Sequence, residues 1–205
     1  MSGPPQAPPP ARPPGASRYT WFIGVVAFLL IVLVTINAVD DQGAEPGGPE
    51  RNAKLVPFAA PLADAAPRDD GAEDANLNSE RACKIRGRGI LNICEEAEKG
   101  PVVLALFPTD ASRCAAVMEQ FDRLARRLPD VRFAAVGSRG KREALQGRRH
   151  EFPVGWDRDG GVATGYGLVG CPQITFAHEG GVVVETTRRQ LTDDEIARRT
   201  ERLRR

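Results

Sequence analysis

Histidine, the side chain that most often transfers protons and binds metals, is nearly absent from this sequence. The 205 residues include two, His150 and His178, and neither lies at ligand spacing from a cysteine. No phosphate-binding glycine loop, Ser-His-Asp set or paired-carboxylate motif stands out either. These absences disfavour metal, phosphate-loop and triad chemistry, and we expect no metal and no cofactor.

The sequence also lacks an excess of charge of either sign. Lys and Arg together number 28 and Asp and Glu 27, which leaves a net charge of +1. A nucleic-acid-binding protein needs a concentrated basic face, and this balance gives no case for one. We therefore expect no nucleic-acid partner.

The first 18 residues lack the apolar side chains that a core requires. They contain seven prolines together with Gly, Ala, Ser and two arginines, Arg12 and Arg18. Such a segment buries little apolar surface. We predict that residues 1–18 form a disordered cytoplasmic tail.

Residues 19–39, YTWFIGVVAFLLIVLVTINAV, contain no charged side chain. A helix of this length spans about 31 Å, close to the thickness of the hydrocarbon layer of a bilayer. The alternative is a cleaved signal peptide, but its apolar region normally has about 7–15 residues, and Ile36-Asn37-Ala38 is a poor match to a small-x-small cleavage site. The pattern favours a retained transmembrane helix, with the lipid bilayer as a partner.

Charges on the two sides of this segment predict its orientation. Arg12 and Arg18 precede it, whereas Asp40 and Asp41 follow it. The positive-inside rule then places the N-terminus in the cytoplasm and the C-terminal part outside, as a single-pass protein of the cell membrane. Residues 40–80, rich in Gly, Pro, Ala and acidic residues, predict an extracytoplasmic flexible linker. Its one apolar patch, 55–58, forms either a marginal strand or a docking point on the domain.

The composition changes near residue 81, and 81–205 reads as one α/β domain. Apolar runs, helical periodicity and turn residues predict its elements. We expect strands at 101–107 and 131–136, helices at 112–128, 139–149 and 162–166, a hairpin of 173–177 with 182–185, and a last helix that begins at a Thr192–Glu195 capping box. The order β-α-β-α-α-β-β-α indicates parallel strands joined by crossover helices, followed by an antiparallel hairpin.

Residues 166–176, YGLVGCPQITF, and the glycines at 180 and 181 carry a resemblance to a known family. This stretch resembles the cis-proline strand and hairpin of thioredoxins, with Pro172 in the place of the cis-proline. Taken with the strand, the cysteine-containing helix and the turn at 157–160, residues 101–205 are most similar to membrane-anchored, TlpA-type thioredoxin-like disulfide reductases. The resemblance implies a thioredoxin-like sandwich, a central mixed sheet flanked by helices, preceded here by the transmembrane helix and the linker.

One departure from the family changes the expected chemistry. The family has Cys-x-x-Cys at the start of the helix that follows its first buried strand. Here Cys114 matches the second, resolving cysteine, and Ala111 stands at the position of the first. The ordinary dithiol mechanism therefore cannot run through this motif alone.

The resemblance also predicts that a second cysteine lies at the site. The family's cis-proline loop packs against its Cys-x-x-Cys loop, so Cys171 is expected near Cys114, and Cys114, Cys171 and Pro172 are the predicted catalytic residues. The helix N-terminus favours a thiolate at Cys114 as the attacking group, whereas the family register makes Cys114 the resolving cysteine. A static disulfide and two inert thiols are the alternatives to a redox pair. Cys83 and Cys94 are then expected to form a structural disulfide, although four cysteines allow three pairings.

Two classes of function follow. The first is an anchored, extracytoplasmic thiol–disulfide oxidoreductase that exchanges disulfides with cysteine-containing proteins through the Cys114/Cys171 pair. A peroxidase variant, in which Cys114 is oxidised and Cys171 resolves it, is the other enzymatic alternative, but the Pro-x-x-x-Thr-x-x-Cys pattern of peroxiredoxins is not met. The second is a redox-inactive thioredoxin-like module for binding or assembly at the membrane, in which the cysteine missing at Ala111 marks a lost activity.

Overall fold

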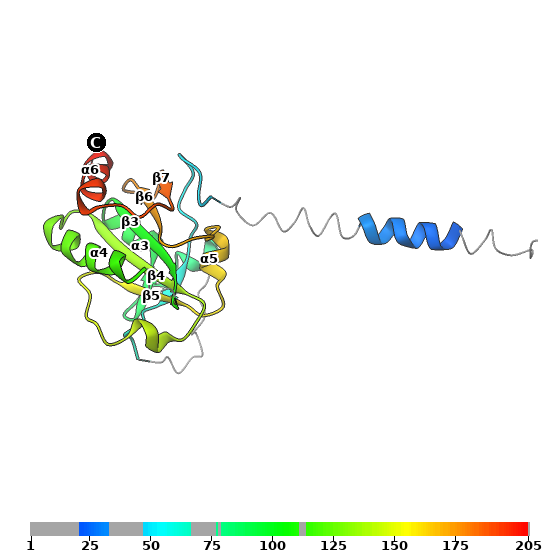
Figure 1. Cartoon of the computed structure of the whole chain (residues 1–205), viewed down its shortest axis with the longest axis horizontal. Helices are drawn as coiled ribbons and strands as arrows, with labels where there is room; N and C mark the ends of the chain where they lie inside the picture. Colours follow the sequence, from blue (N-terminus) through cyan, green and yellow to red (C-terminus); the bar gives the residue numbers. More distant parts are fainter. Residues whose placement is uncertain (1–20, 33–46, 67–76, 78, 111–113, 205) are drawn as a thin grey trace, which may run out of the picture. The chain divides into compact units, whose positions relative to one another are not determined.

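The structure, a computed structural model, describes residues 21–32, 47–66, 77, 79–110 and 114–204. The chain divides into two units, Met1–Gln42 and Gly43–Arg205, which are taken separately. The second unit contains a central five-stranded sheet (Figure 1).

The central sheet is mixed, in the order β5-β4-β3-β6-β7. Its first three strands run parallel, and the last two form an antiparallel hairpin on the other side of β3. The strands are β3 (Val102–Pro108), β4 (Arg132–Ser138), β5 (Val154–Asp157), β6 (Gln173–Ala177) and β7 (Val183–Thr187).

Helices cover both faces of the sheet. Alternate residues of β3 point to opposite faces: Val103 and Ala105 join one apolar cluster, and Leu104 joins the other. The first cluster includes side chains of α4 (Ala115–Arg127) and α6 (Asp193–Leu203); the second includes those of α3 (Ile93–Lys99) and α5 (Gly161–Gly165). The chain therefore has a thioredoxin-like α/β fold, and the continuous apolar run of β3 reflects burial on both faces.

Most predicted elements are confirmed with shifts of a few residues at their ends. The hairpin forms around the turn at 178–181. The last helix begins at Thr192, whose hydroxyl accepts a hydrogen bond from the Glu195 N–H while the Glu195 carboxylate accepts one from the Thr192 N–H. Ile196 and Leu203 are buried on its inner face, as the pattern predicts.

The predicted helix over 139–149 is wrong: the structure has only a short 3-10 helix, η2 (Arg142–Leu145), in this stretch. Positive φ angles at Arg139, Gly140 and Gly147 interrupt any longer helix. Arg142 is buried, and its guanidinium donates hydrogen bonds to the carbonyl oxygens of Leu62, Ala63 and Ala65. These tertiary hydrogen bonds set the local conformation, and the helical spacing of residues in the sequence gives no sign of them.

Strand β5 was not predicted, and it adds a parallel edge strand next to β4. Its sequence, VGWD, is short and contains a glycine, which weakens the strand signal. Gly155 fits a closely packed position, where a Cβ would lie 3.1 and 3.2 Å from side-chain atoms of Leu91 and Ala60.

The linker predicted over 40–80 does not extend through 47–66, which pack on the domain. Leu55 and Phe58 are buried, so the docking alternative for the apolar patch is confirmed. Just beyond the patch, β1 (Ala59–Pro61) pairs with β2 (Ile90–Asn92) as a separate two-stranded sheet. The packed part of the domain therefore begins before residue 81.

Residues 21–32 of the predicted transmembrane segment are helical, and their large apolar side chains are mostly exposed. Within the described ranges, no helix has both the length and the apolar character needed to cross a bilayer. The other residues of the predicted span, 19, 20 and 33–39, lie outside the described part of the chain, as do the predicted tail 1–18 and residues 40–46, 67–76 and 78 of the linker.

Candidate redox site

The candidate site lies where strand β3 ends and helix α4 begins. Cys114 is the N-cap residue of α4, a helix of 13 residues. Its side chain is 1% exposed and belongs to the apolar cluster under α4 and α6. Position 111, where the resemblance would require the missing cysteine, lies outside the described residues, and Asp110 is a turn residue rather than the helix cap.

The second cysteine enters from the loop before β6. The peptide bond between Cys171 and Pro172 is cis, as the resemblance implies for Pro172. Antiparallel pairing sets Gln173 opposite Leu106, so the residues before β6 reach the end of β3 from which the chain enters α4. The structure joins Cys114 and Cys171 in a disulfide with a Cα–Cα distance of 6.0 Å, which lies within the usual range. The predicted pairing is thus observed.

Two hydrogen bonds hold the loop that carries Cys171. The buried Gln173 side chain donates to the Tyr166 carbonyl oxygen at 2.7 Å. The Tyr166 hydroxyl donates to the Val56 carbonyl oxygen at 2.9 Å, and complete burial raises the pKa of this phenol, which keeps it neutral. The first bond therefore joins the two ends of the loop, and the second joins the loop to Val56, in the segment that precedes β1.

The two sulfur-bearing residues differ in their access to solvent. Cys171 is partly exposed, whereas Cys114 is buried. Cys171 also lines a cavity of about 490 Å³ at the carboxyl ends of β3 and β4, together with Pro108, Ser138, Arg139, Ala163, Leu168, Val169 and Gly170. An approaching molecule can thus contact the disulfide from the Cys171 side. Sequence reasoning missed Arg139 and Val169, because neither belongs to the motif that identifies the site.

A buried carboxyl group stands behind this cavity. Asp157, at the end of β5, accepts hydrogen bonds from the backbone N–H groups of Val162 and Ala163 at 3.1 and 3.0 Å. Burial raises the pKa of its carboxyl group, and these two bonds oppose part of that rise. Asp157 therefore fixes the start of α5, one wall of the cavity.

The raised pKa predicts a pH-dependent stability. The folded state retains the Asp157 proton to higher pH than the unfolded chain, so its contribution to stability falls as pH rises above about 4. We expect the free energy of unfolding of the native protein minus that of Asp157→Asn to decrease from pH 4 upward, as measured by urea denaturation. Asp194→Asn, at an exposed position of α6 away from Asp157, is the control. A difference that increased with pH would contradict the assigned direction.

The other cysteine pair lies at the opposite end of β6. Cys83 and Cys94 form a disulfide with a Cα–Cα distance of 5.4 Å, as predicted. They line a cavity with Gly180 and Gly181, which follow the carboxyl end of β6, whereas Cys171 precedes its first residue. The Asn92 side chain donates to the carbonyl oxygens of Ala82 and Ile85 and accepts from the N–H groups of Cys94 and Glu95. This disulfide therefore belongs to a local hydrogen-bonded clip between α2 (Ser79–Ala82) and α3.

Comparison with solved structures supports the thioredoxin-like fold. The chain is similar to a putative thiol:disulfide interchange protein DsbE from Chlorobium tepidum, with 15% identity, a TM-score of 0.57, and coverage of 75% of this chain and 97% of that one. It is also similar to the dsbF protein of MTB (20% identity, TM-score 0.54, 72% and 96% coverage) and to an exposed lipoprotein thioredoxin of Streptococcus pneumoniae (17%, 0.51, 71% and 98%). No family model and no curated protein matches the sequence. These structural neighbours are thiol–disulfide oxidoreductases of the thioredoxin family, and at such identities the likeness shows the fold.

Proposed function

We propose that this protein is a membrane-anchored thiol–disulfide oxidoreductase that exchanges disulfides with cysteine-containing extracytoplasmic proteins through Cys114 and Cys171. The observation that carries the proposal is the disulfide itself, which joins a helix N-terminus to the cis-proline loop beside an open cavity. Exchange requires access for a second molecule, but access alone does not distinguish the two disulfides, because Cys83 and Cys94 also line a cavity. The distinguishing feature is the position of the Cys114–Cys171 bond between the N-terminus of α4 and the cis-proline loop.

Exchange with a substrate dithiol proceeds through a mixed disulfide. A substrate thiolate attacks the Cys171 sulfur, the Cys114–Cys171 bond breaks, and Cys114 leaves as a thiolate. The second substrate thiolate then attacks the substrate sulfur of the mixed disulfide and releases Cys171. The substrate loses two electrons, the domain gains them, and the two substrate protons pass to solvent or to the released thiolates. The reverse sequence reduces a substrate disulfide.

Burial and helix position give the two cysteines different roles. Cys171 is the more exposed of the two residues and lines the cavity, so we expect a protein thiolate to attack its sulfur. Cys114 caps α4, whose unpaired N–H groups and dipole stabilise a leaving thiolate. This arrangement favours the family register, in which Cys114 resolves, over Cys114 as the attacking group.

The anchor and the compartment are proposed from the sequence. The uncharged stretch 19–39 and the arginines before it favour a single membrane span with the redox domain outside the cytoplasm. The resemblance to TlpA-type reductases fits that placement, and an oxidising compartment accounts for two disulfides in one domain. Retention of the full chain in membranes after carbonate extraction tests the anchor; its release would refute it.

Reduction potentials of the two disulfides test the proposed chemistry. We expect the Cys114–Cys171 bond to titrate well above about −300 mV, because labile, exchange-competent disulfides lie above that value. Mass-spectrometric thiol trapping of the full chain across a dithiothreitol or glutathione series measures both bonds in one sample.

The Cys83–Cys94 bond is the internal control, expected to resist reduction down to about −300 mV or below. If both bonds resist equally, or if Cys114 and Cys171 are not joined in the isolated protein, the exchange mechanism fails. The redox-inactive binding module is then the better description.

A further inference from the structure

An arginine, Arg139, lines the cavity beside Cys171. Arg139 lines the cavity and is exposed, and among the described residues no carboxylate forms an ion pair with its guanidinium. Many other exposed arginines of the domain do have such partners, for example Arg86 with Glu98 and Arg148 with Glu119. The described residues that line the cavity include no acidic side chain. Within the described part of the chain, the cavity therefore offers a positive charge with no counter-charge among its lining residues.

The backbone holds Arg139 in an unusual conformation that fixes where its side chain starts. Its φ of 53° lies in the left-handed region, which costs free energy for a residue with a side chain. The Arg139 N–H donates to the Asp157 carbonyl oxygen at 2.9 Å, and the Thr109 hydroxyl donates to the Arg139 carbonyl oxygen. A Cβ at Gly160 would lie 2.7 Å from Arg139 Nε, so that glycine leaves room for the side chain.

The other side of the cavity is apolar and exposed. Val169 is 59% exposed, and among the described residues from 47 to 204 no other large apolar side chain is as open. It belongs to the same loop as Cys171, and Leu168 and Val169 both line the cavity. An isolated exposed valine needs no explanation, but this one lines the same cavity as Cys171 and Arg139.

We propose that this cavity docks the substrate, and that it selects a protein segment with an acidic side chain close to the reacting cysteine and an apolar side chain beside it. Arg139 binds the carboxylate, and Val169 and Leu168 contact the apolar group. A cavity of about 490 Å³ is roughly 8–10 Å across, a distance that three extended residues cover. The acidic residue therefore lies within about three positions of the substrate cysteine. This inference rests on the proposed exchange function and names its substrate class.

A set of dithiol peptides tests the preference. The peptides are identical except for Glu, Gln or Lys two residues before the first cysteine. The oxidised full-length protein is mixed with each peptide, and the second-order rate of peptide oxidation is followed by thiol trapping. Because a neighbouring charge also shifts the pKa of the substrate thiol, each rate is divided by the rate of the same peptide with oxidised glutathione.

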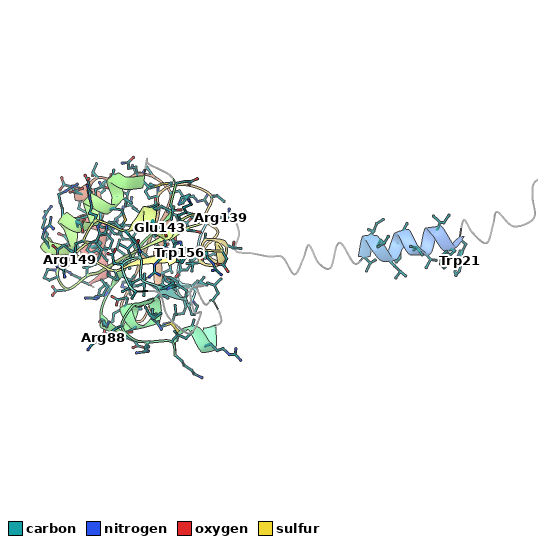
Figure 2. All side chains as sticks on the ribbon, turned by 90° about the horizontal axis from the view of Figure 1, so that it is seen from below. Trp21, Arg88, Arg139, Glu143, Arg149 and Trp156 are labelled. Atoms are coloured by element: carbon teal, nitrogen blue, oxygen red, sulfur yellow. A yellow bond between two sulfur atoms is a disulfide. The ribbon has the colours of Figure 1, made fainter. Side chains whose placement is uncertain are left out.

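We expect the native protein to oxidise the Glu peptide about 5-fold faster than the Lys peptide at low salt, and this ratio to shrink at 0.5 M NaCl, where exposed charges are screened. Arg139→Gln should bring the ratio to about one, Arg139→Glu should reverse it, and Arg139→Lys should retain it. Arg88→Glu is the matched control, because Arg88 is exposed and lies on a different part of the domain from Arg139 in Figure 2.

The outcomes separate this inference from the function on which it rests. Oxidation of all peptides with a Glu/Lys ratio that Arg139→Gln leaves unchanged would overturn the docking proposal alone. A ratio that falls equally in Arg88→Glu would show a general effect of net charge and would also overturn it. Failure to oxidise any peptide would instead contradict the exchange function.

Discussion

Replacing Cys114 with serine should turn the domain into a trap for its substrates. The remaining Cys171 thiolate attacks a substrate disulfide and forms a mixed disulfide, but no second thiol is available to resolve it. Catalytic exchange should fall by about 10³-fold or more, as expected when one member of a pair that acts together is removed. Intact-mass spectrometry after incubation with a disulfide-containing peptide should detect one peptide bound at Cys171.

The reciprocal variant should behave differently, and this asymmetry is the sharper test. Cys171→Ser should lose exchange to the same extent without accumulating a mixed disulfide, because Cys114 is 1% exposed. Equal trapping by both single variants would mean that Cys114 is accessible and that the assigned roles are wrong. Equal melting temperatures of the two reduced variants would show that both are folded under the assay conditions.

Removing the other disulfide should affect stability rather than chemistry. Cys83 and Cys94 close a loop with a sequence separation of 11, for which the chain-entropy model gives about 3 kcal/mol. The variant Cys83→Ala/Cys94→Ala should therefore unfold at a temperature lower by about 6–12 °C. Calorimetry or thermal denaturation followed by circular dichroism measures the change, and exchange activity at 25 °C should be retained.

A matched variant separates the covalent bond from its surroundings. Arg86→Gln removes the ion pair with Glu98 and the hydrogen bond to the Cys83 carbonyl oxygen but keeps the disulfide, and we expect a much smaller fall in melting temperature because both charged partners are substantially exposed. If Cys83→Ala/Cys94→Ala abolished exchange while leaving the melting temperature unchanged, the second disulfide would belong to the redox chemistry instead.

The sequence predicts the parts of the fold whose residues carry local patterns. Val102 to Leu106 are apolar at every position because both faces of β3 are covered, and the Thr192 capping box marks its helix directly. The stretch that contains Cys171 and Pro172 resembles a known family, so the pairing with Cys114 could be expected before any geometry was seen.

Other parts depend on tertiary contacts that no local pattern records. Arg142 turns inward to carbonyl groups roughly 80 residues away in sequence, and the helix predicted over 139–149 does not form. The sequence also could not show which of the two cysteines is the more exposed, because the burial of Cys114 depends on the packing of α4 and α6. Arg139 was missed for the same reason: its position in the cavity depends on the ends of two strands and on a glycine in another turn.

The disulfide between the start of α4 and the cis-proline loop also links the oxidation state to the stability of the fold. A Cys-x-x-Cys bond closes a ring of a few residues, whereas the Cys114–Cys171 bond spans a separation of 57. Under the chain-entropy model a cross-link of that length stabilises the folded chain by about 4 kcal/mol. Reduction therefore removes a long-range cross-link as well as freeing two thiols, so we expect the reduced domain to unfold at a lower temperature and to be cleaved more readily by proteases.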